Sequence, residues 1–154
     1  MGLGFSALPD QRSKLVPTAD QPLPERVYVV LTGIPLRSWV SIQFLRKAAP
    51  ALQASRKAEG NLYSAVRSID GYQHTLTVWR DTQSVGRYVM CDAHRQAMDA
   101  ADNLRHETLP LKHFGYWTTP DKIPSWAEFK IMFDEYPMVK PVSVKASDLV
   151  SQPQ

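Results

Sequence analysis

His94 is the residue of this chain whose type and position are best suited to chemistry. An imidazole ionises near neutral pH, so it serves as an acid, a base or a metal ligand. Counted at about 100° per residue along a predicted helix, His94 lies at the edge of the apolar stripe formed by Ala93, Ala97 and Ala101. We therefore expect His94 to point toward a cavity between helix and sheet. The alternative is a helix-edge histidine that only packs or hydrogen-bonds.

Arg37 is a second candidate, because it follows Pro35 at a predicted junction between a strand and a helix. A guanidinium in this position is able to clamp the carboxylate or phosphate of a substrate. A structural salt bridge or plain exposure to solvent is the alternative. His74 and His113, both on predicted strands, are interpreted as exposed or hydrogen-bonded strand residues.

Seven elements must position these residues. Alternating and helical patterns of apolar residues predict the order strand, helix, strand, strand, helix, strand, helix, over residues 26–34, 38–60, 61–70, 72–80, 82–103, 112–119 and from 125 onward. Asp70 and Gly71 form a strong tight-turn signal between two strands. Pro50 predicts a kink or break in the first helix. Ser38 is expected to cap the first helix, Asp81 or Thr82 the second, and Ser125 the last.

This order is the split βαβ, ferredoxin-like arrangement. It predicts an α+β fold with a four-stranded antiparallel sheet, both main helices on one face, and an extra C-terminal helix. Many apolar side chains would remain on the other face, more than a monomer leaves in water. We therefore expect a homodimer in which two copies pack sheet to sheet, the arrangement of a dimeric α/β barrel.

Proline-rich ends flank the predicted domain. Residues 1–25 are expected to form an extended or disordered arm, residues 26–136 the ferredoxin-like domain, and residues 137–154 a flexible tail.

Composition excludes several classes of protein. The 154 residues are 44% hydrophobic and 21% charged, as in a single globular domain. The net charge of +3 comes from scattered Lys and Arg that Asp and Glu largely offset, so no nucleic-acid partner is expected. Cys91 is the single cysteine and the four histidines are dispersed, so neither an intrachain disulfide nor a zinc site is expected.

Targeting and catalytic motifs are also absent from the sequence. No signal peptide and no run of about 18 apolar residues is present, so a cytoplasmic protein without membrane contact is expected. The sequence has no GxSxG elbow, Walker loop, HExxH motif or GxGxxG after a strand.

Four segments together resemble a known group of proteins. The chain is similar to the proteins grouped near spheroidene monooxygenase and, more broadly, to the dimeric α/β-barrel superfamily that includes the antibiotic biosynthesis monooxygenases. The resemblance covers residues 26–133 and rests on Ile34-Pro-Leu-Arg-Ser-Trp39 with Phe44-Leu45, Thr75-Leu-Thr-Val-Trp-Arg-Asp81, Ala93-His-Arg-Gln-Ala-Met98, and Phe114-Gly-Tyr-Trp117 followed by Pro124-Ser-Trp-Ala-Glu-Phe129.

The resemblance implies two kinds of site. Cofactor-free oxygenases of this superfamily hold a flat aromatic substrate with Trp, Tyr, His and Asn side chains, which makes four residues candidates for substrate binding: Tyr28, Trp79, Tyr116 and Trp117. The alternative is that they are core or interface aromatics. Strand parity also places Tyr116 opposite Trp117, so they cannot all line one cavity.

In haem-binding relatives a histidine on the second helix ligates the iron, which makes His94 a candidate haem ligand. The haem-degrading enzymes pair this histidine with an Asn on the first strand and a Trp one helix face away. Here the first strand has no Asn, and Ser84 stands ten residues before His94, so that triad is not present as such. The cofactor is thus unknown, either none or haem. The sequence favours a monooxygenase-like enzyme acting on a hydrophobic or aromatic metabolite; the alternative is a non-catalytic ligand- or haem-binding dimer of the same fold.

Overall fold

The computed structural model describes residues 22–36, 41–105, 109 and 111–135. Its elements follow the predicted order: β1 (Val27–Pro35), α1 (Ser41–Lys57), β2 (Asn61–Ile69), β3 (Tyr72–Trp79), α2 (Thr82–Val89), α3 (Asp92–Leu104), β4 (Lys112–Thr118), the 3₁₀ helix η3 (Pro120–Lys122) and α4 (Trp126–Glu135). Most of the predicted arm, and the whole predicted tail, lie outside the described residues, so both stay predictions.

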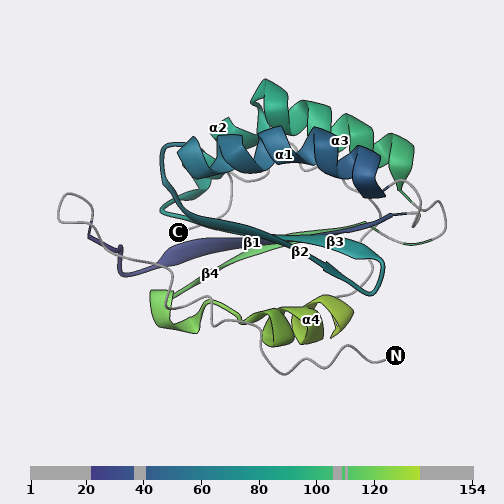
Figure 1. Ribbon diagram of the computed structural model, residues 1–154. Coiled ribbons are helices and arrows are strands. Elements are labelled where there is room, and N and C mark those ends of the chain that lie inside the picture. Colours follow the sequence, from purple (N-terminus) through teal and green to yellow (C-terminus); the bar gives the residue numbers. More distant parts are fainter. Residues whose placement is uncertain (1–21, 37–40, 106–108, 110, 136–154) are drawn as a thin grey trace.

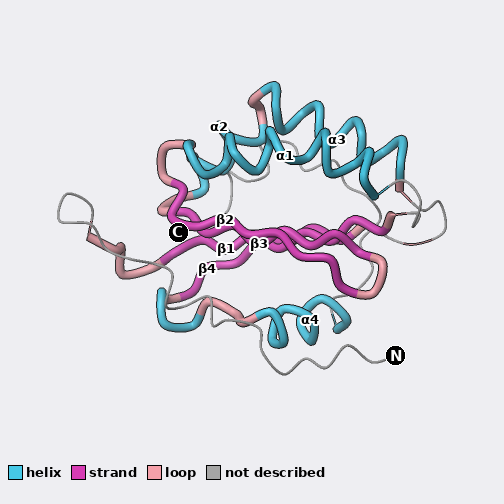
Figure 2. Tube along the Cα trace, in the orientation of Figure 1, coloured by secondary structure: helices cyan, strands magenta, loops and turns pink. Residues whose placement is uncertain are grey.

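A single antiparallel sheet carries the fold. Its strand order is β2-β3-β1-β4, with β1 paired to both β3 and β4. This is the predicted α+β, ferredoxin-like sheet. Figures 1 and 2 show three layers, with α1, α2 and α3 on one face of the sheet and α4 on the other. Within the described part of the chain, no helix is long and apolar enough to cross a membrane.

The predicted hairpin turn is confirmed. Asp70 has a φ of 50° and Gly71 a φ of 81°. Two consecutive positive φ angles give the twist that joins antiparallel strands directly, and glycine adopts such an angle without steric cost.

The second main helix differs from its prediction, because α2 and α3 replace one helix over residues 82–103. Asp81 does cap α2, since its Oδ1 accepts a hydrogen bond from the Ser84 amide at 2.7 Å. The predicted stripe advanced in steps of four, and each step turns it by about 40° around the axis. The interruption at Met90 and Cys91 changes the direction of the apolar stripe, so that α2 and α3 each turn buried residues toward the rest of the protein.

The break predicted at Pro50 does not occur, because α1 continues through that residue, whereas the alternative of a kink stays a prediction. Pro50 is exposed, whereas Phe44, Ala51 and Ser55 on the opposite side are buried. Buried residues before and after Pro50 in the sequence therefore pack against the protein and keep the helix continuous. The residue predicted to cap it, Ser38, lies outside the described residues.

The face expected to be bare is covered by α4, which corrects that expectation. Trp126, Phe129 and Phe133 are at most 3% exposed and join the core cluster on this face of the sheet. Ser125 caps α4 as predicted, because its hydroxyl accepts from the Glu128 amide at 3.2 Å. The open face from which a sheet-to-sheet homodimer was inferred is therefore not open. The homodimer itself stays a prediction.

Candidate functional site

His94 lies near the start of α3, on the helix layer of the protein. Its Nδ1 is 3.2 Å from the carbonyl oxygen of Val89, at the end of α2. A carbonyl only accepts a hydrogen bond, so Nδ1 carries the proton when the ring is neutral. The Nε2 of neutral His94 therefore keeps its lone pair, as a base or a metal ligand requires.

His113 on β4 is the second histidine of the site. Its Nδ1 is 2.8 Å from the hydroxyl of Thr32 on β1, the residue paired with it across the strands. Burial and, to a smaller extent, the nearby His94 together lower the pKa of His113 to about 4. Burial also lowers the pKa of His94, while the bond to the Val89 carbonyl opposes that shift. Both imidazoles are therefore neutral at physiological pH.

Thr32 is more exposed than its neighbours on the helix-facing side of β1. On the helix-facing side of β1, Val30 and Ile34 are buried, whereas Thr32 between them is partly exposed. His94 and His113 are partly exposed as well. Part of each of these three side chains is therefore within reach of a small molecule.

A group of aromatic rings adjoins the histidines. The ring of Tyr88 stands edge-on to His94 at 4.9 Å and lies 5.3 Å from Trp79, and its hydroxyl donates to the Ala51 carbonyl. Trp79 is fully buried, and its indole nitrogen donates to the Thr77 hydroxyl at 2.8 Å. Trp79 thus supports the site from within the core, as the alternative interpretation held.

Tyr28 and Trp117 occupy paired positions on β1 and β4, on the same face as the histidines. Their rings meet edge to face at 5.3 Å. Tyr28 is 1% exposed, whereas Trp117 is partly exposed. Of these two predicted binding residues, only Trp117 offers surface to a ligand.

The remaining candidates do not join the site. Tyr116 packs on the opposite face, where its hydroxyl lies 3.8 Å from the sulfur of Met132 on α4. This confirms the parity argument and makes Tyr116 a core residue of the α4 layer. Arg37 lies outside the described residues, so its role stays a prediction.

His74 also belongs to the α4 face, contrary to the expectation of an exposed or hydrogen-bonded residue. It is 1% exposed, and neither ring nitrogen has a hydrogen-bond partner among the residues that the structure describes. The rings of Tyr72, Phe129 and Phe133 surround it.

The sequence analysis missed the contact between Thr32 and His113. Strand parity puts both on the helix-facing side, and the ferredoxin-like order makes their strands neighbours, so the signal was present. Within the ranges that the structure describes, no group of three or more His, Cys, Asp or Glu residues is placed to hold a metal.

No family model matches the sequence, and no curated protein matches it. Solved structures do match the fold. A conserved protein from Methanosarcina mazei gives a TM-score of 0.55 at 13% identity, over 60% of this chain and 92% of that one.

Two proposed antibiotic biosynthesis monooxygenases match similarly. The protein from Nitrosomonas europaea gives 0.52 at 13% identity, over 58% of this chain and 95% of its own. The protein from Deinococcus radiodurans gives 0.51 at 17% identity, over 58% and 89%. The antibiotic-biosynthesis-monooxygenase-like fold is therefore confirmed, while the resemblance to proteins near spheroidene monooxygenase stays a prediction.

Proposed function

We propose that this protein is a monooxygenase-like enzyme that acts on a hydrophobic or aromatic metabolite between the sheet and the helices. The observation that carries the proposal is a pair of neutral, partly exposed imidazoles on the helix-facing side of the sheet: His113, hydrogen-bonded to Thr32, and His94, which is near enough to lower the pKa of His113. A neutral imidazole that a bound molecule can reach is suited to take a proton from it.

His94 acts as the base in this proposal. Its Nε2 accepts the proton of an acidic hydroxyl on an aromatic substrate, while Nδ1 stays bonded to the Val89 carbonyl. The resulting electron-rich anion is the species that meets oxygen. His113, held by Thr32, orients the substrate from the sheet side, and the aromatic surroundings limit access of water.

A second candidate function is ligand or haem binding without turnover. The hydrogen bond from His94 to the Val89 carbonyl favours it, because metal-bound histidines characteristically donate their other ring nitrogen to such an acceptor. His94 would hold the iron through Nε2. A bound haem supplies redox chemistry at its iron that the side chains of this protein do not.

One experiment separates these functions. Absorbance spectra are recorded with and without haemin for the wild type, His94→Ala and His74→Phe, the last being a control on the opposite face of the sheet. A Soret band that shifts on binding, and is lost only in His94→Ala, supports haem binding. If no specific band forms, haem is excluded. Oxygen consumption with a panel of phenols then tests the enzyme, and equal rates for wild type and His94→Ala contradict it.

The predicted cellular location and partners of the protein are part of the same proposal. We place the protein in the cytoplasm, acting on a small molecule and without nucleic acid or membrane. The predicted homodimer would have to form beside α4 or displace it.

A further inference from the structure

A small pocket lies at one end of the sheet. It has a volume of about 260 Å³ and is lined by Arg26, Arg80, Asp81 and Trp117. These residues meet because Tyr28 is paired with both Trp79 and Trp117. The residue just before β1 and the two just after β3 are thereby brought beside the end of β4.

Within the described part of the chain, one contact holds each arginine at the pocket, and most of the donors of both stay uncommitted. The guanidinium carbon of Arg26 lies 5.3 Å from the centroid of the Trp117 ring. One terminal nitrogen of Arg80 donates to the Pro22 carbonyl at 3.0 Å. An arginine has five N–H donors in a planar fork, so both side chains retain the geometry that binds a carboxylate.

The charge of the pocket is not balanced within the described residues. Neither Arg26 nor Arg80 forms an ion pair with a described carboxylate. Asp81 shares the pocket, but its Oδ1 caps α2 by accepting from the Ser84 amide. Two guanidinium groups and one carboxylate give a formal charge of +1, which a single negative charge neutralises.

We propose that this pocket binds an aromatic monocarboxylate, with the carboxylate between Arg26 and Arg80 and the ring against Trp117. Arginine forks recognise a planar carboxylate by paired hydrogen bonds. Trp117 is partly exposed and lines the pocket, so its indole is available to contact the aromatic body of the ligand. A dianion such as phosphate fits less well, because the carboxylate of Asp81 repels its second charge.

This inference deepens the proposed function, because Trp117 lies on the same face as His94 and His113. It names the class of substrate as an aromatic acid. It remains separable from catalysis, since binding in this pocket needs neither histidine.

The test is a titration with sodium benzoate, followed by the indole N–H resonance of Trp117 in ¹H–¹⁵N spectra and assigned with Trp117→Phe. Benzyl alcohol is the neutral analogue, and inorganic phosphate is the dianion. The variants are Arg26→Gln and Arg80→Gln. Arg67→Gln is the matched control, because Arg67 is an exposed arginine on the distant edge strand β2.

We expect benzoate to shift the Trp117 resonance saturably. Arg26→Gln and Arg80→Gln should each weaken binding about tenfold, the effect of losing a charge-assisted hydrogen bond, and Arg67→Gln should bind like the wild type. Equal affinities for benzoate and benzyl alcohol, tighter binding of phosphate, or an unmoved resonance would overturn the inference. If benzoate fails to bind while oxygen consumption still depends on His94, only this inference is lost. Benzoate binding without any such activity removes only the proposed reaction.

Discussion

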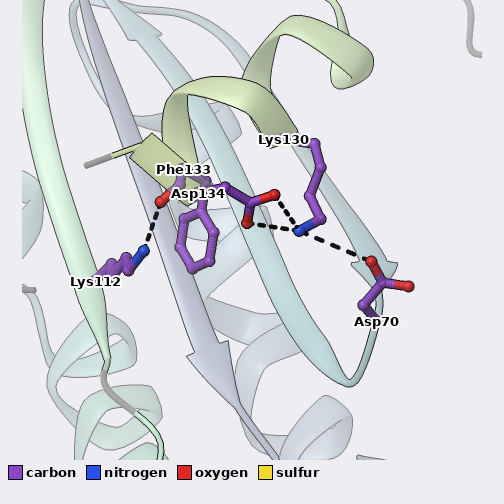
Figure 3. Close-up of polar contacts among 5 residues, drawn as sticks. All are labelled: Asp70, Lys112, Lys130, Phe133 and Asp134. Carbon is purple, nitrogen blue, oxygen red and sulfur yellow. Dashed lines mark hydrogen bonds and ion pairs between the residues drawn. The ribbon is translucent and has the colours of Figure 1, made fainter. Parts of the chain in front are cut away.

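Lys112 contacts Phe133 in two ways: its ammonium donates to the Phe133 carbonyl oxygen at 2.6 Å, and it lies 4.6 Å from the centroid of the phenyl ring. Figure 3 shows Lys112 reaching from β4 to the end of α4. The last carbonyls of a helix lack partners within the helix, and a cation near them is favourable. Lys112 therefore fastens to the sheet the end of the helix that covers it.

Replacing Lys112 by Met tests this contact. Met keeps much of the apolar stem but removes the donor, so the free energy of unfolding should fall by about 1–2 kcal/mol. Urea denaturation measures the change. Lys122→Met is the control, because Lys122 is exposed on η3. Equal stabilities of the two variants would show that the contact contributes nothing.

Gly33→Ala tests how closely α4 approaches the sheet. A Cβ on Gly33 would overlap the ring of Phe133 and reach within 3.0 Å of His74 Nδ1. Alanine should therefore push the end of α4 away and cost about 1–3 kcal/mol, as overpacking does.

A double-mutant cycle identifies the cause of that loss. In the background of Phe133→Ala the ring is absent, so Gly33→Ala should cost little or even stabilise the strand. Urea denaturation of the four proteins gives the coupling energy. Additive effects would place the strain somewhere other than at Phe133.

The order of elements was predictable from the sequence because it depends on local patterns. The hairpin at Asp70, the caps at Asp81 and Ser125, and the apolar run of β1 each involve residues that are close in sequence. The position of α4 depends instead on contacts between distant residues. Phe133 fits against Gly33, a hundred residues earlier, and no local pattern encodes that.

The candidate site was also predictable only in part from the sequence. The helix stripe placed His94 at an edge, and parity separated Tyr116 from Trp117. The hydrogen bond from His94 to Val89 depends on the interruption between α2 and α3, which the sequence analysis did not predict. The interruption between the two helices, rather than the apolar stripe, thus determines the tautomer of His94.

His74 predicts a loss of stability in acid. Burial lowers its pKa to about 4, from 6.5 in the unfolded chain. The Thr32 backbone, Asp134 and Asp70 oppose this shift, and Lys130 adds to it. Between these two pH values the unfolded state binds the proton more tightly, so stability falls as pH decreases from 6.5 to 4. His74 accounts for a loss of up to about 3 kcal/mol.

His74→Phe isolates this contribution from those of His94 and His113, whose pKa values are also lowered. Phe keeps a ring against Tyr72 and removes two buried nitrogens without partners. The variant should be more stable than the wild type, and the difference should grow from pH 6.5 to 4. Denaturation curves across this range measure it. A difference that does not change with pH would contradict the assignment.

Self-association should increase when α4 is loosened. Phe129 and Phe133 are the residues of α4 that, with Trp126, cover the apolar face of the sheet. Replacing both phenylalanines by Ser weakens that cover and exposes Leu76 and Val78 beneath it, so a second copy becomes the available partner for the face. Light scattering over a range of concentrations should then give a higher mass for Phe129→Ser/Phe133→Ser than for the wild type. Ile131→Ser is the control, because Ile131 is 58% exposed on the same helix. If the wild type is already a dimer and the double variant is a monomer, α4 itself builds the interface and the predicted competition between helix and second copy is wrong.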